Sequence, residues 1–121
     1  MAEYITVRSG EFRAEISLEH LGELPRTNFR KLLRLMRDNP DENLDDLGRW
    51  IRGRPAETKA AWAEASREYQ HGWRFAPKRA RDENSLRIMR ENRRLKTAVK
   101  QTKAAYDTAQ ALKTIFEKEI N

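Results

Sequence analysis

The chain has 121 residues, a formal net charge of +6, 36% charged residues and 38% hydrophobic residues. This length suits one domain with an extension, and the low apolar fraction indicates that much of the chain is solvated helix surface. The absence of cysteine excludes disulfides and thiolate chemistry. No apolar run approaches the roughly 20 residues of a membrane span, and the N-terminus lacks a signal-peptide pattern, so we expect a cytoplasmic protein that does not enter a membrane.

Residues 4–18 are predicted to form a β-hairpin. A Ser-Gly dipeptide in the middle of this segment suits a two-residue turn, because glycine tolerates positive φ. That turn pairs Val7 with Phe12 and Ile5 with Ala14, and it places all four on one face. Because an isolated hairpin is marginal in water, we expect this one to pack on the helices that follow.

Three short helices are predicted next. The first covers about 27–38, where apolar residues recur at helical spacing before an Asn-Pro pair. The second covers about 42–52, and Gly53 is expected to close it. The third covers about 55–70, with Pro55 in its first turn, where proline is tolerated.

The last element is predicted to be one long helix over about 82–120, after a linker at 74–81 that Pro77 interrupts. The helix contains neither Gly nor Pro, and it would be on the order of 55 Å long. With Asn92 at heptad position a, seven of the eleven a and d positions are apolar, which is a moderate coiled-coil pattern. The helix is therefore expected to fold back on the N-terminal unit or to pair with a second copy as a homodimer. The residues predicted for self-association are Ile88, Asn92, Leu95, Val99, Tyr106 and Phe116.

The predicted fold class is mainly α with a minor α+β character. An N-terminal β-hairpin packs on three short helices, and a long C-terminal helix with a coiled-coil pattern follows. The predicted segments are a hairpin and three-helix unit at 1–73, a basic linker at 74–81 and a long basic helix at 82–121.

Positive charge is concentrated in residues 74–103, which carry 11 Lys and Arg against 3 Asp and Glu. On the long helix these cations lie outside the heptad seam and form a broad outer face. Each can neutralise a phosphate and release a counterion, and arginine can bind a phosphate through two parallel hydrogen bonds. A face that serves only solubility would mix charges of both signs, and this one does not. The predicted binding residues are Arg74, Lys78, Arg79, Arg81, Arg87, Arg90, Arg93, Arg94, Lys96 and Lys100, with Arg30, Arg34 and Arg37 of the first helix.

Two aromatic residues, Trp73 and Phe75, flank Arg74 at the start of the linker. Such residues can stack on unpaired nucleic-acid bases while neighbouring cations bind the backbone. The alternative is that both aromatics are buried in the three-helix core. We expect burial, because large aromatic side chains usually lie inside a protein.

No catalytic residue, metal site or cofactor is predicted. His20 and His71 are the two histidines and have no cysteine companions for a zinc site. The acidic cluster at 38–46 lacks the glycine and glutamate positions of a calcium loop, and helix capping explains it better. A helix-turn-helix is disfavoured, because its recognition helix would be acidic or alanine-rich.

Together these patterns predict a non-enzymatic nucleic-acid-associated binding or regulatory protein that contacts the phosphate backbone through its Arg/Lys-rich helix. The alternative is a small inhibitor of the type that phages and mobile elements carry, similar to anti-CRISPR proteins in composition. Such an inhibitor would bind a host nucleic-acid-binding protein by charge complementarity. The patterns leave open whether the partner is DNA, RNA or protein.

Overall fold

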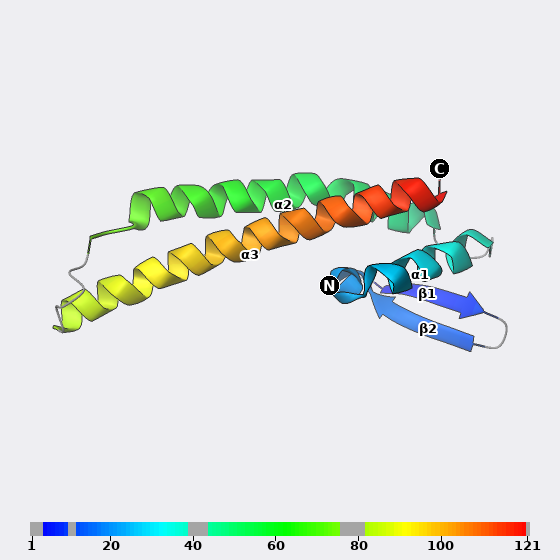
Figure 1. Ribbon diagram of the computed structural model, residues 1–121, viewed down its shortest axis with the longest axis horizontal. Coiled ribbons are helices and arrows are strands. Elements are labelled where there is room, and N and C mark those ends of the chain that lie inside the picture. Colours follow the sequence, from blue (N-terminus) through cyan, green and yellow to red (C-terminus); the bar gives the residue numbers. More distant parts are fainter. Residues whose placement is uncertain (1–3, 10–11, 39–43, 76–81, 121) are drawn as a thin grey trace. The chain divides into compact units, whose positions relative to one another are not determined.

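The computed structural model describes residues 4–9, 12–38, 44–75 and 82–120. Within these residues the protein is mainly helical, with a small two-stranded hairpin and a long C-terminal helix, as predicted at that level (Figure 1). Contacts between Cα atoms divide the chain into two compact units. Unit 1 is Met1–Pro55 with Thr108–Asn121, and unit 2 is Ala56–Asp107. The two long helices each contribute residues to both units.

The hairpin consists of β1 (Tyr4–Ser9) and β2 (Phe12–Ser17), which pair antiparallel. Its register differs from the predicted one, since Ile5 lies opposite Ile16 and Val7 lies opposite Ala14. The predicted pairing is therefore wrong by two residues on the second strand. Because side chains alternate with a period of two, this slip keeps the predicted apolar residues on one face.

A short 3-10 helix, η1 (Leu18–Glu23), follows β2 directly and was not predicted. Its two leucines, Leu18 and Leu21, are buried, as the i, i+3 overlap of a 3-10 turn allows. The first α-helix, α1 (Arg26–Asp38), agrees with the predicted helix to within one residue. Its spacing of apolar residues gives a single buried stripe.

The core of unit 1 brings together residues far apart in the sequence. The hairpin, η1, α1, the start of α2 and the end of α3 all contribute to it. The last turns of α3 therefore share the buried core of unit 1 with the N-terminal elements. The buried members are Ile5, Leu18, Leu21, Phe29, Leu32, Leu33, Met36, Leu47, Ile51, Leu112, Ile115 and Phe116.

The second and third predicted helices form one continuous helix, α2 (Leu44–Gly72), so the prediction of three short helices is wrong. The chain stays helical through Gly53 and Pro55, which the sequence analysis took as a stop and a start. An internal proline removes one backbone hydrogen bond and costs about 3 kcal/mol. Burial of Ile51 before it and Thr58 after it shows that α2 is packed on both sides of the proline, and packing of this kind offsets the local cost.

The long C-terminal helix is α3 (Glu83–Ile120), as predicted to within one residue. In unit 2, α3 lies antiparallel to α2 (Figure 1). The contacts show this direction, because a later residue of α2 meets an earlier residue of α3. Trp62 meets Tyr106, and Gly72 meets Leu95. No helix of the described residues is both long and apolar enough to cross a membrane.

Two glycines of α2 provide a matched test of the continuous helix. A methyl group on Gly53 would meet nothing within 4 Å, whereas one on Gly48 would lie 3.0 Å from Cζ of the buried Phe116. Gly53→Ala should raise the free energy of unfolding by about 0.5–1 kcal/mol, because alanine is the better helix former. Gly48→Ala should gain less or lose stability, since the Phe116 ring has no room to move.

Urea unfolding of the two variants measures this difference. If Gly53→Ala destabilised the protein, the helix would end near residue 53 with glycine in a conformation that alanine cannot adopt. Equal stabilisation by both variants would contradict the close packing of Gly48 on Phe116.

Candidate nucleic-acid interface

The start of α3 is fixed by an N-terminal cap. The Asp82 carboxylate Oδ1 accepts a hydrogen bond of 2.7 Å from the backbone N–H of Ser85, and the Asp82 carbonyl accepts one of 3.1 Å from the N–H of Leu86. Aspartate is among the preferred N-cap residues, and its charge also suits the positive end of the helix. The cap therefore defines where the first cations of α3 lie.

One side of α3 packs against α2 within unit 2. The rings of Trp62 and Tyr106 stack with their centroids 5.7 Å apart and an interplanar angle of 27°. Leu95 is 3% exposed, and a methyl group on Gly72 would lie 2.9 Å from its Cδ1. Gly72 therefore lets Leu95 approach the end of α2 closely. These contacts fix the rotation of α3 about its own axis in this unit.

The sides of α3 that do not pack against α2 are cationic and exposed. At 100° per residue, Arg90 and Arg93 lie roughly opposite Leu95 and Tyr106. Every described cation predicted on this helix is exposed to solvent. They are Arg87, Arg90, Arg93, Arg94, Lys96, Lys100 and Lys103. We call this set the cationic face.

Few of these cations are neutralised by the protein itself. Arg94 donates from Nε to both carboxylate oxygens of Glu91 at 3.1 Å. This contact lowers the pKa of Glu91 and raises the pKa of Arg94. The shared hydrogen bond is the larger cause of both shifts, and the attraction between the opposite charges is the smaller one. Arg87 donates to the amide oxygen of Asn84 at 2.8 Å, which leaves its charge unpaired.

The remaining cations of the face make no ion pair with a carboxylate in the part of the chain that the structure describes. These are Arg90, Arg93, Lys96, Lys100 and Lys103. The only acidic residue of α3 between Asn84 and Lys103 is Glu91. The face therefore keeps most of its positive charge available to a partner.

Three shallow hollows follow one another along the first half of α3. The first lies between Arg74 and the start of α3, and Asn84 and Arg87 line both it and the second hollow. Arg90 lines both the second and the third, which extends to Gln101. Each of the three hollows is lined by at least one arginine, and neighbouring hollows share lining residues.

The end of α2 carries two aromatic side chains into solvent. Trp73 is 48% exposed and Phe75 is 77% exposed, so the expectation that both are buried is wrong. The side-chain amide of Asn92 holds Arg74 between them. Arg74 N–H donates to Asn92 Oδ1 at 3.0 Å, and Asn92 Nδ2 donates to the Arg74 carbonyl at 2.6 Å. This two-point contact joins the segment that follows α2 to α3, between the two exposed rings.

The predicted cations of α1 lie in unit 1 and are partly engaged there. Arg34 donates from Nε and Nη2 to the two carboxylate oxygens of Glu119 at 3.2 and 3.3 Å. Arg37 donates to the backbone carbonyl of Glu119 at 3.3 Å, near the negative end of α3. Arg30 is exposed. Two of these three arginines thus secure the C-terminal end of α3, a role the sequence analysis missed.

The residues predicted for self-association are engaged within the chain. Leu95 packs on Gly72, Tyr106 stacks on Trp62, Asn92 holds Arg74, and Phe116 belongs to the core of unit 1. Ile88 and Val99 are half-buried. A second copy that used this seam would have to displace α2.

The predicted binding residues Lys78, Arg79 and Arg81 lie outside the described residues. Other residues join the interface that sequence reasoning did not single out, namely Asn84, Thr97 and Gln101 in the hollows. Their spacing along the helix was the available signal, because positions three, four and seven apart share a face. Thr97 lies seven residues after Arg90, Gln101 lies seven after Arg94, and Asn84 lies three before Arg87.

The charges of the two units differ. Unit 1 contains 12 Lys and Arg and 12 Asp and Glu, whereas unit 2 contains 13 and 7. The net charge of +6 therefore belongs entirely to unit 2, which carries the cationic face. A polyanion would be attracted to this unit and not to unit 1.

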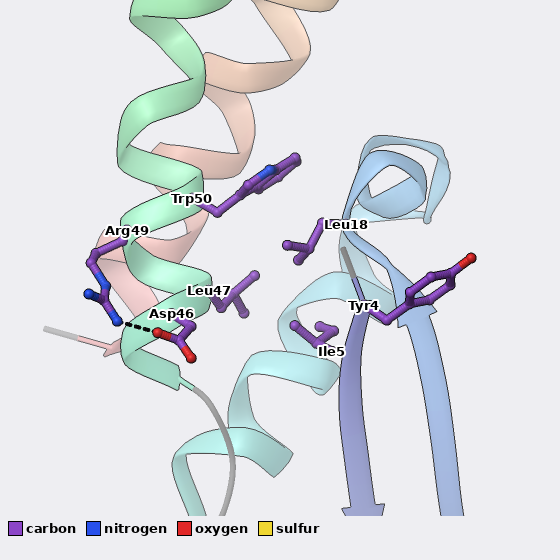
Figure 2. Close-up of a pocket in the computed structure, with 7 residues that line it drawn as sticks. All are labelled: Tyr4, Ile5, Leu18, Asp46, Leu47, Arg49 and Trp50. Atoms are coloured by element: carbon purple, nitrogen blue, oxygen red, sulfur yellow. Dashed lines mark hydrogen bonds and ion pairs between the residues drawn. The ribbon is translucent and has the colours of Figure 1, made fainter. Parts of the chain in front are cut away.

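A separate hollow in unit 1 lies between the hairpin and the start of α2 (Figure 2). Its floor is apolar, with Ile5, Leu18 and Leu47 facing the gap. The Asp46 carboxylate and the Arg49 guanidinium at its edge pair with each other. The described residues include no group of three or more His, Asp or Glu side chains placed to hold a metal ion.

Comparison of the chain with protein-family models, curated proteins and solved structures found no match. The function proposed below therefore rests on the chemistry of the chain itself.

The cap of α3 makes a pH-dependent prediction. The hydrogen bond from the backbone N–H of Ser85 lowers the pKa of Asp82 from its ordinary value. A carboxylate whose pKa is lowered in the folded state contributes stability above its unfolded pKa of about 4, and this contribution is lost as the pH falls through the lower folded pKa. The start of α3 should therefore fray in acid.

An NMR titration of the Asp82 carboxyl should give a midpoint below that of an ordinary aspartate. The variant Asp82→Ala should lose helix at neutral pH and should lack this acid-dependent step. A midpoint at or above the ordinary value would show that the carboxylate does not cap α3.

Proposed function

We propose that this protein is a non-enzymatic nucleic-acid-binding protein that contacts the phosphate backbone through the cationic face of α3. The observation that carries the proposal is the exposed cationic face of α3, most of whose members make no ion pair with a carboxylate among the described residues. Each such cation that contacts a phosphate releases condensed counterions, which favours binding and makes it depend on salt.

The arrangement of the face supports a polyanion over a small anion. A small anion site needs donors that converge on one point, whereas these side chains are spread along more than four turns of helix. The linked hollows between Arg74 and Gln101 provide successive places for phosphates at the foot of the long arginine side chains. Backbone contacts of this kind bind without reading sequence.

Two matched double variants test whether this face, and not net charge alone, carries the binding. Arg93→Glu with Lys100→Glu reverses two cations of the face. Lys59→Glu with Arg67→Glu reverses one lysine and one arginine that are exposed on α2 in the same unit. Both variants lower the formal net charge from +6 by four units.

Binding to a labelled duplex should be measured across a salt series. The α3 variant should bind at least about tenfold more weakly at low salt. Its plot of log binding constant against log salt concentration should be less steep, by the amount expected for the loss of about two phosphate contacts. The α2 variant should retain most of the affinity and slope of the unchanged protein. Equal losses in both variants would mean that the face has no special role.

The alternative proposal is an inhibitor that binds an acidic patch of a host nucleic-acid-binding protein through the same cations. It predicts no binding to duplex or single-stranded nucleic acid, even at low salt. An inhibitor could instead mimic phosphates with a row of acidic residues. Glu15 lies on β2 whereas Glu19 and Glu23 lie on η1, so these three do not share one element. This arrangement favours the cationic face as the binding surface in either case.

A further inference from the structure

Exposed aromatic side chains are concentrated at the end of α2. Among the described residues, the large apolar side chains that are exposed are Tyr4, Leu35, Trp73, Phe75 and Leu86. Two of the three aromatics in this set are separated by a single arginine. A ring that stays in water forgoes the free energy of burial, and a ligand that covers both rings would recover part of it.

The backbone that carries these rings is held in place. Asn92 uses both its amide oxygen and its amide nitrogen on the N–H and the carbonyl of Arg74. The contact spans 18 residues of sequence and joins the end of α2 to α3. Because the residue between Trp73 and Phe75 is fixed, less conformational entropy is lost when a ligand contacts the rings.

The end of α2 is also continuous with the cationic face. Arg74 and Arg87 line the same hollow, and Arg87 and Arg90 line the next. Arg74 therefore lies between the two aromatic residues, and Arg87 and Arg90 line the hollows next to it. This alternation does not provide the contiguous apolar surface that a protein interface core requires.

We propose that Trp73 and Phe75 form a stacking site for unpaired bases, so that the preferred ligand of this protein is single-stranded nucleic acid. This inference rests on the proposed function, because the phosphates of the same strand would follow Arg74, Arg87 and Arg90. Every base has a flat face that an aromatic ring can stack on, so the site accepts any sequence. In a duplex those faces are occupied by neighbouring base pairs, and a protein reaches only the base edges in the grooves.

The test compares a labelled oligothymidine of about 16 nucleotides with a mixed-sequence duplex of about 16 base pairs, lengths within the site sizes of single-strand-binding modules. The affinity for each ligand is measured at one low salt concentration for the unchanged protein and three variants. These are the double variant Trp73→Ala/Phe75→Ala, the conservative double variant Trp73→Phe/Phe75→Tyr, and the single variant Tyr4→Ala. Tyr4 is an exposed aromatic of unit 1 and serves as the matched control.

The double alanine variant should bind the single strand roughly tenfold more weakly for each aromatic removed, and its duplex affinity should change less than twofold. The conservative double variant should restore single-strand binding, and Tyr4→Ala should leave both affinities unchanged. Because both rings are exposed, the unfolding midpoint should stay the same in all variants.

Asn92 is a positioning residue for this site. Asn92→Ala should lower the ratio of single-strand to duplex affinity without lowering duplex affinity, because it frees the backbone of Arg74 but removes no charge. Tryptophan fluorescence gives a direct readout of stacking. The single strand should quench the emission of the unchanged protein, and this quenching should be lost in Trp73→Phe.

Loss of single-strand and duplex binding to the same extent in the double alanine variant, or no loss at all, would overturn the stacking site. The proposed function would still stand in that case if the charge-reversal variant of α3 lost duplex affinity. Failure of the unchanged protein to bind either nucleic acid would reject both proposals.

Discussion

The stacking of Trp62 on Tyr106 and the close approach of Leu95 to Gly72 determine which side of α3 meets α2 in unit 2. A helix has only one rotation about its axis that satisfies both contacts. Once that rotation is fixed, the residues on the other side are committed to solvent. In this chain those residues are arginines and lysines with few acids among them, so a packing constraint also determines the electrostatic surface.

The two units differ in buried core and in net charge. Unit 1 has balanced charge and gathers the larger apolar core, which includes the last turns of α3. There Arg34 and Arg37 hold Glu119, so cations that the sequence analysis assigned to a ligand stabilise the chain. Unit 2 carries all of the net charge and has fewer buried side chains. Its described packing lies in the seam between α2 and α3, where Trp62 meets Tyr106 and Leu95 meets Gly72.

The long helix, α1 and the hairpin could be predicted from sequence, because each has strong local periodicity and clear ends. The continuity of α2 could not, since Gly53 and Pro55 are local helix-breaking residues and the packing that outweighs them is tertiary. The cationic side chains of α3 were predicted from the lack of acids around them, and their exposure agrees with that. The exposure of Trp73 and Phe75 was missed because large aromatic side chains usually lie inside a protein. The contact of Asn92 with the Arg74 backbone was missed because the heptad pattern placed Asn92 in a seam between two copies. A side-chain contact to a backbone 18 residues away leaves no periodic trace in a sequence.

If a polyanion binds the cationic face of α3 as we propose, its contacts fall on unit 2. Backbone amide NMR spectra of the full chain, recorded while a single-stranded oligonucleotide is added at low salt, test it most directly. Binding through this face should give its largest signal changes on residues 73–75 and 84–103, and added salt should reverse them. Changes that cluster in unit 1, or signals that do not move, would contradict it.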